Sequence, residues 1–288
     1  MAKGVAINVG ANKDPKWGAC RGPIFPNGSF KFIHVPWDEV TYGMTDPPPK
    51  KYEDMCYKEY VAHMCPHLLD NFVAESPNFR ISVYASSGAA KLANKAIWRL
   101  REKEDYLLFY ATLKFEGEEE KRERWINRDW GAYIVGLFKI DRIWKRGSVL
   151  SDEYARKAFE GYCFYEVLKR PECFGGYLSE ENECQQCKNV RACSESPYYD
   201  PRPPPDPSTP WVKGMEKESG LLEKAIPLSS PENSNRWSDL ACELFKYFKT
   251  SEAKRLGVNK KAIPQAVLTC EGECLDKLLS LCILRKMT

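Results

Sequence analysis

Hydrophobic positions in the first half of the chain follow the short period of β-strands. Residues 4–9 (GVAINV) form a nearly continuous apolar run, which is typical of a buried strand. Asn27 and Gly28 separate two further strand-like runs, and this dipeptide is the strongest short signal for a hairpin turn. We expect three more strands, at residues 81–85, 104–115 and 130–145. The last two are rich in aromatic and β-branched residues, so they predict a sheet with a well-filled core.

Other segments repeat their apolar residues every three or four positions, which is the period of a helix face. The clearest series is Ala89, Leu92, Ala93, Ala96, Ile97 and Leu100. We expect further helices from Asp152 to Lys169, from Trp237 toward Gly257, and from Leu275 to Ile283. Because two of these lie near the end of the chain, the pattern predicts a mainly helical C-terminal third.

A proline-rich segment divides the chain into two regions. Residues 198–210 (YYDPRPPPDPSTP) have the composition of a linker or surface strap in polyproline conformation. We therefore expect an α+β region at 1–197 and a mainly helical region at 211–288. The fold class that the sequence predicts is α+β.

From its length, composition and N-terminal sequence we expect a globular protein of the cytoplasm. With 288 residues, of which 43% are hydrophobic, the chain can bury a sizeable core. The N-terminus lacks the pattern of a secretory signal, and the longest apolar run, residues 278–284, is too short to span a bilayer. A cytoplasmic location implies reduced thiols, so clustered cysteines bind metal more often than they pair. The net charge of +3 permits a nucleic-acid partner without requiring one.

Four cysteines have the spacing of metal ligands. Cys173, Cys184, Cys187 and Cys193 form the series C-x10-C-x2-C-x5-C. A C-x2-C pair directs two thiolates at one centre, and single cysteines on either side favour a compact [4Fe-4S] loop over the paired knuckles of zinc sites. The end of the series resembles the iron-sulfur loop of helix-hairpin-helix DNA glycosylases. We predict a closed structural [4Fe-4S] cluster, with zinc or reduced structural thiols as the alternatives.

The remaining cysteines and histidines favour structural roles. An apolar helical pattern favours buried core thiols at Cys270, Cys274 and Cys282. The segment HMCPH offers ligand chemistry, but its spacing around a proline favours a local structural role for His63, Cys65 and His67. Cys20 stands beside Arg21, which could depress the pKa of the thiol, although a buried small thiol is the commoner case.

Established catalytic motifs are missing from the sequence. It contains no GxGxxG, no P-loop, no GxSxG elbow and no HExxH. The candidate polar groups are instead Asn12, Asp14 and Arg21 in the first loop. Arg21 can pair with a phosphate or a base edge through its planar fork, while Asp14 fits a turn better than a general base. We predict Tyr110 and Trp130 as the surfaces on which a base would stack.

Three basic residues share one side of the helix expected at 89–100. They are Lys91, Lys95 and Arg99. Such a stripe can meet phosphates, although a solvated helix face is the default interpretation of clustered charge. Lys95 stands in the middle of the stripe and is our candidate phosphate contact.

The two longest predicted strands resemble the core of PUA-like barrels, including the ASCH and EVE domains. The resemblance is carried by LFY at 108–110 and YIVGLFKI at 133–140, in which Gly136 suits a barrel bend. Such barrels commonly bind a nucleobase in an aromatic-lined pocket. The resemblance therefore implies a PUA-like β-barrel core with flanking helices and a base-recognition surface.

Longer stretches resemble the third family of nucleotide modification associated domain proteins. They are GANKDPKWGACRGPIFPNGSFKFIHVP at 10–36, LLFYATL at 107–113, AYIVGLFKID at 132–141 and RLGVNKKAIP at 255–264. This resemblance implies a protein that modifies or recognises bases in DNA or RNA, and it leaves open whether the protein is an enzyme. The alternatives are a non-enzymatic nucleic-acid-binding protein with a structural zinc and an enzyme that acts on free nucleotides.

Overall fold

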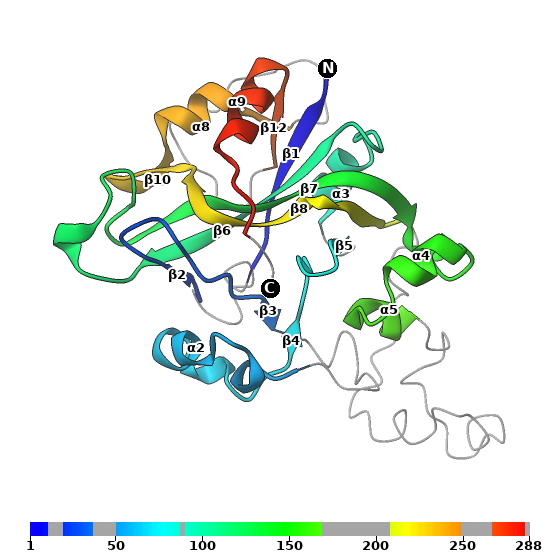
Figure 1. The fold of residues 1–288 in the computed structure, drawn as a ribbon, viewed down its shortest axis with the longest axis horizontal. Coiled ribbons are helices and arrows are strands. Elements are labelled where there is room, and N and C mark those ends of the chain that lie inside the picture. The colour runs from blue at the N-terminus through cyan, green and yellow to red at the C-terminus, as the bar shows by residue number, and fades with distance from the viewer. Residues whose placement is uncertain (11–19, 37–49, 87–89, 169–207, 249–266, 286–288) are drawn as a thin grey trace.

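A mixed β-sheet runs through the middle of the molecule, with helices on both sides (Figure 1). The computed structural model describes residues 1–10, 20–36, 50–86, 90–168, 208–248 and 267–285. The main sheet has eight strands in the order β11-β12-β1-β6-β7-β8-β5, and β2 pairs with β6 off this path. The predicted α+β fold class is confirmed.

Three predicted strands form the centre of the sheet. β1 (Lys3–Asn8) runs parallel to β6 (Tyr106–Phe115), and β7 (Trp130–Lys145) runs antiparallel to β6. β2 (Gly22–Ile24) also runs parallel to β6. The other strands of this sheet are β5 (Val83–Ala85), β8 (Pro210–Pro227), β11 (Lys246–Tyr247) and β12 (Leu268–Glu271).

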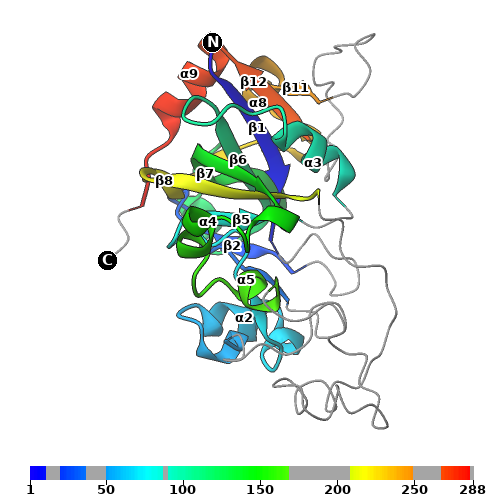
Figure 2. The same ribbon diagram turned by 90° about the vertical axis from the view of Figure 1, so that its right-hand side faces the viewer.

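Apolar side chains cover both faces of the sheet, which is why its central strands read as continuous apolar runs. On one face the rings of Phe79, Phe109 and Phe138 meet at centroid distances of 4.7 to 5.7 Å. On the other face α9 (Glu273–Leu281) lies over Gly4, where an added Cβ would stand 3.1 Å from Leu275 Cδ1. Figure 2 shows α9 and α3 (Lys91–Ile97) on opposite sides of β1.

The helices match the predicted positions only in part. α4 (Glu153–Ala158) and α5 (Cys163–Leu168) occupy the span predicted as one helix. They are separate because Gly161, in the connection between them, has a φ of +73°, a left-handed conformation that an α-helix does not contain. The Asp152 side chain caps α4 by accepting a hydrogen bond from the Ala155 backbone N–H at 2.9 Å.

A smaller layer with its own buried cluster lies on the α2 side of the sheet (Figure 1). It contains α2 (Lys58–Met64), the 3-10 turns η3 (Tyr52–Asp54) and η4 (Pro66–Leu68), and the strand pair β3 (Val35–Pro36) with β4 (Val73–Ala74). The Tyr52 hydroxyl donates to the His34 carbonyl at 2.5 Å and so ties this layer to the segment that follows β2.

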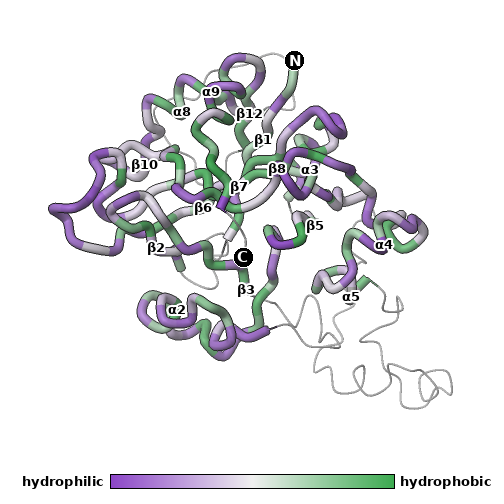
Figure 3. The backbone as a smooth tube through the Cα atoms, in the orientation of Figure 1, coloured by the Kyte–Doolittle hydropathy of each residue, from purple (hydrophilic) through white to green (hydrophobic). Residues whose placement is uncertain are grey.

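The predicted turn at Asn27-Gly28 is present. The Gly28 backbone N–H donates to the Phe25 carbonyl at 2.9 Å, and the φ of Gly28 is +82°, a value that favours glycine. The 3-10 turns η5 (Glu119–Lys121) and η6 (Arg146–Ser148) come before and after β7 in the chain. β9 (Ser229–Ser230) pairs with β10 (Asn233–Trp237) in a separate two-stranded sheet. In Figure 3 the connection between β6 and β7 is hydrophilic, whereas the central strands are largely hydrophobic.

The expected PUA-like barrel is not present among the described residues. The path of strands starts at β11 and ends at β5, so the described part of the sheet stays open. Gly136 lies next to an irregularity in the pairing of β7 with β6 and β8. Close packing also requires a glycine at position 136, because an added Cβ would stand 2.3 Å from Phe79 Cε1. The glycine serves close packing of an aromatic ring in an open sheet.

The prediction of a mainly helical C-terminal region is wrong for the residues that are described. β8 spans 18 residues and pairs with β7 and β5, in the same sheet as β1. α8 (Asp239–Leu244) is short because the chain is already extended at Phe245, whose ψ is 153°, and enters β11 directly. No helix among the described residues is long and apolar enough to cross a membrane.

Candidate functional site

The parallel pairing along β6 is interrupted at one place. β1 pairs with β6 as far as Asn8 and Tyr110, and β2 resumes the pairing at Gly22 and Leu113. The chain therefore leaves the sheet after β1 and returns to the same neighbouring strand. Asn12 and Asp14, two of the predicted polar candidates, belong to the excursion and lie outside the described residues. We take the described residues at this break as the candidate site.

The break collects polar and aromatic residues on one face of the sheet. Asn8 is opposite Tyr110, and alternation along β6 places Thr112 on the same face. Lys114 lies opposite Trp130 and continues that face. Asn8, Tyr110 and Thr112 are all buried, so the floor of the site is shielded from water.

Arg21 and Trp130 form the rim of the site. The Arg21 guanidinium lies over the Trp130 ring, 4.4 Å from its centroid. Arg21 is half-buried, and its Nε has no hydrogen-bond partner within the part of the chain that is described. Desolvation lowers the pKa of Arg21 from its ordinary value, although a guanidinium remains charged near neutral pH. The structure thus brings together two of the residues that the sequence predicted.

Tyr110 lies at the break but does not offer a stacking surface. Its side chain is fully buried, and burial raises its pKa well above the ordinary value, with nearby Tyr247 adding to the effect. Tyr247 in turn accepts a hydrogen bond from Trp237 Nε1 at 2.7 Å. The sequence expectation of an accessible ring at Tyr110 is corrected because the strand is covered on this face.

Lys95 lies away from this break. It is exposed on α3, which packs on the opposite side of β1 from α9 (Figure 2). Gly4 faces α9, and alternation along β1 puts Asn8 on the same side as Gly4. The structure therefore does not bring Lys95 together with Arg21 and Trp130.

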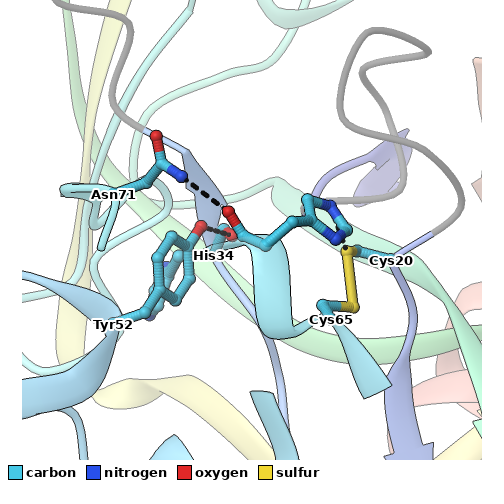
Figure 4. Close-up of a disulfide and its surroundings, with 6 residues drawn as sticks. Cys20, His34, Tyr52, Cys65 and Asn71 are labelled. Atoms are coloured by element: carbon cyan, nitrogen blue, oxygen red, sulfur yellow. Dashed lines mark hydrogen bonds between the residues drawn. A yellow bond between two sulfur atoms is a disulfide. The ribbon is translucent and has the colours of Figure 1, made fainter. Parts of the chain in front are cut away.

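A disulfide joins the entry of β2 to the smaller layer. Cys20 and Cys65 are bonded with their Cα atoms 5.8 Å apart, and His67 Nε2 lies 3.6 Å from Cys20 Sγ (Figure 4). Because Cys20 directly precedes Arg21, the bond fixes the backbone beside the candidate site. Because we expected reduced thiols, the sequence analysis did not predict this bond. The structural role that it favoured for Cys65 agrees with the disulfide.

The cysteines of the C-terminal part are thiols without a disulfide. Cys270 is buried, and burial raises the pKa of the Cys282 thiol to about 12. Such thiols are poor nucleophiles at neutral pH. No group of three or more metal-ligating side chains occurs within the described residues. The four predicted ligands Cys173, Cys184, Cys187 and Cys193 lie outside them.

Sequence reasoning missed two polar groups that the fold encloses, the buried Asn8 and the buried Nδ1 atom of His34. Asn8 ends β1, and its signal is a polar residue inside an apolar strand run. The Nδ1 atom of His34 is buried with no hydrogen-bond partner in the described structure, and desolvation lowers the pKa of His34 to about 4. His34 alternates with Phe30 and Phe32, so its sequence pattern is that of a core position.

Two open cavities elsewhere on the molecule lack the features that mark the Arg21 site as a binding site. The larger, of about 710 Å³, lies between the β6–β7 connection and the β9–β10 hairpin. Its lining mixes Arg122, Arg124 and Arg128 with Asp129 and Glu232. The smaller, of about 320 Å³, is lined by opposite charges of α4. Neither has a buried charged group without a partner, so the break beside Arg21 remains the candidate site.

The fold and the site define an α+β protein with a half-buried guanidinium beside an aromatic ring. The profile of nucleotide modification associated domain 3 matches residues 3–263. The chain therefore belongs to the nucleotide modification associated domain 3 family, as its sequence resemblance predicted. No curated protein and no solved structure gives a significant match to this chain.

Proposed function

We propose that this protein modifies or recognises a nucleobase, and that Arg21 and Trp130 form part of the base-binding site. The observation that carries the proposal is the half-buried Arg21, whose Nε lacks a partner among the described residues and whose guanidinium lies over Trp130. Membership of the nucleotide modification family supports a nucleotide as the ligand.

The chemistry of Arg21 suits a planar, electron-rich ligand. A guanidinium presents five N–H donors in a rigid fork that matches phosphate oxygens or the acceptor edge of a base. A buried donor without a partner is costly, so a ligand that accepts its hydrogen bond gains that free energy on binding. The Trp130 ring fixes the guanidinium plane, and a base can stack on such planes and rings.

Three further predictions belong to this proposal and stand on the sequence. Asn12, in the excursion after β1, is a candidate hydrogen-bonding partner for the base. Lys95 is a candidate phosphate contact on a second surface. Cys173, Cys184, Cys187 and Cys193 would hold a structural [4Fe-4S] cluster, with zinc as the alternative, on the basis of their spacing.

The ligand is identified by titration of a panel of nucleosides, nucleotides and oligonucleotides, DNA and RNA, plain and base-modified. We expect saturable binding of at least one base-containing ligand. Trp130→Ala should weaken that binding roughly tenfold or more, because one stacked base contributes about 1 to 3 kcal/mol.

The matched control is Tyr154→Ala, which removes an exposed aromatic side chain from α4. Equal affinities of the Trp130→Ala and Tyr154→Ala proteins for every ligand would refute the site. Binding of free nucleotides without binding of any oligonucleotide would favour an enzyme that acts on free nucleotides.

A further inference from the structure

The exposed side of α3 and of the two residues that follow it combines three cations with two apolar side chains. Lys91, Lys95 and Arg99 are exposed, as are Leu92 and Trp98, at 40% and 38% of their surface. The buried side of the helix is formed by Ala93, Ala96 and Ile97, which pack into the main core. The helix therefore packs into the core through the side opposite to Lys91 and Lys95.

The exposed residues are regularly spaced along the helix. Lys91, Lys95 and Trp98 stand at i, i+4 and i+7, which places them in one column along the helix. Arg99 lies one turn beyond Lys95. Like charges at i, i+4 repel each other and destabilise an isolated helix by about 0.2 to 0.5 kcal/mol per pair. One such pair, Lys91 with Lys95, lies within the helix, and Arg99 follows just after its end.

The charges are not compensated within the described residues. Lys91 and Lys95 have no ion pair or hydrogen bond there, and Arg99 lies over the Phe248 ring at 5.0 Å. By contrast, Arg101, just beyond the helix, is paired with Glu104 and Asp105. The helix itself, residues 91–97, contains no acidic residue. An anionic partner would relieve the repulsion that the fold leaves in place.

Trp98 adds a stacking group to the cations. Its Nε1 donates to the Ser208 carbonyl at 3.1 Å, so the indole is held in one orientation although it is partly exposed. A fixed ring costs less conformational entropy on binding than a free one. Cations flanking an exposed, oriented aromatic ring are the combination with which proteins bind single-stranded nucleic acid.

We infer that the exposed side of α3 binds the backbone and bases of a single-stranded nucleic acid, with phosphates at Lys91 and Lys95 and a base on Trp98. The choice of nucleic acid over another polyanion rests on the proposed function. The surface lies on the opposite side of β1 from α9 (Figure 2), whereas strand alternation puts Asn8 and Tyr110 of the Arg21 site on the α9 side. The protein would therefore contact a polymer at two places, and a free nucleotide would use only the Arg21 site.

The test is fluorescence anisotropy with labelled single-stranded DNA and RNA over a series of salt concentrations. Lys91→Gln with Lys95→Gln should reduce the slope of log affinity against log salt by about 1.4, because each phosphate contact with a single strand contributes about 0.7. Trp98→Ala should weaken binding roughly tenfold at every salt concentration.

The control pair is Arg156→Gln with Lys217→Gln, which removes two exposed cations that have no ion pair among the described residues. An equal slope in the two double variants overturns the inference, as does the absence of any binding to single strands. A loss of free-nucleotide binding in the α3 variants also overturns it, because the surface would then belong to the nucleotide site.

The two proposals fail separately. If the α3 variants lose the polymer while Trp130→Ala leaves all binding unchanged, the α3 surface stands and the Arg21 site is refuted. If Trp130→Ala weakens nucleotide binding while the α3 variants bind single strands normally, the Arg21 site stands and the α3 surface is refuted. Thermal unfolding of each variant verifies that it is folded.

Discussion

At the scale of single residues, burial separates the roles of similar side chains. Tyr110 and Trp130 are both aromatic residues of the central strands, and both were predicted to stack on a base. Tyr110 is fully buried, whereas Trp130 is partly exposed and lies under Arg21. Local sequence could not separate them, because both lie on the same face of the sheet, and how much of that face is covered depends on elements far along the chain.

His34 gives a residue-scale prediction for the dependence of stability on pH. Its pKa is lowered to about 4 by burial, whereas an unfolded histidine titrates near 6.5. Between these values the unfolded chain binds a proton that the folded protein excludes, so the free energy of unfolding falls as the pH drops from about 6.5. The loss attributable to His34 is about 3 kcal/mol at pH 4.

Urea denaturation at several pH values measures this effect. His34→Leu should remove that part of the pH dependence which His34 causes, while His63→Leu, at an exposed histidine, should keep it. The explanation fails if His34→Leu and the original protein show the same change in stability between pH 7 and pH 4.

At the scale of elements, the local sequence pattern predicted the strands that have long apolar runs. It failed where a segment is a strand only because it pairs with a distant strand. The strands β6 and β7 were predicted within two residues of their ends, because each contains a long apolar run, at residues 106–111 and 130–138. β8 was missed because its sequence is rich in charged residues, and only its pairing with β7 makes it a strand. The pairing of both β1 and β2 with β6 could not be predicted from local sequence, because it joins strands that are far apart along the chain.

The Cys20–Cys65 disulfide gives the element-scale prediction. It closes a loop with a sequence separation of 45, and chain entropy then stabilises the folded state by up to about 4 kcal/mol. A dithiol reductant should therefore lower the urea midpoint of the original protein. Cys65→Ser should have the lower midpoint already and show a smaller response to the reductant.

The control for this prediction is Cys282→Ser, which removes a thiol that is not in a disulfide. It should respond to the reductant like the original protein. A full response of Cys65→Ser would show that another pair of cysteines is responsible.

At the scale of the whole molecule, the open sheet organises two separate surfaces. Asn8 and Tyr110, at the break between β1 and β2, lie on the side of the sheet that carries α9, and α3 lies on the other side of β1 (Figure 2). In a closed barrel we would instead have expected base and phosphate contacts at the same open end of the barrel. The family was predicted from sequence because its matching stretches are spread along the chain, and the profile match over residues 3–263 confirms it.

The proposed iron-sulfur cluster gives the whole-molecule prediction. Protein purified without oxygen should be brown and contain about four irons per chain, because four thiolates of this spacing suit a cubane. Cys187→Ala should lose the iron and the colour, since metal binding and folding are coupled at such sites. Cys282→Ala should keep both. A colourless protein with one stoichiometric zinc would identify the alternative metal.

The central claim is that Arg21 contacts a nucleotide, and the most direct measurement is calorimetric titration of the best ligand into the original protein and into Arg21→Lys. Lysine keeps the positive charge but loses the planar fork, and a hydrogen bond to a charged group contributes about 1.5 to 3 kcal/mol. The account predicts that Arg21→Lys binds the ligand roughly tenfold or more weakly at an unchanged melting temperature. Unchanged affinity in the Arg21→Lys protein would contradict it.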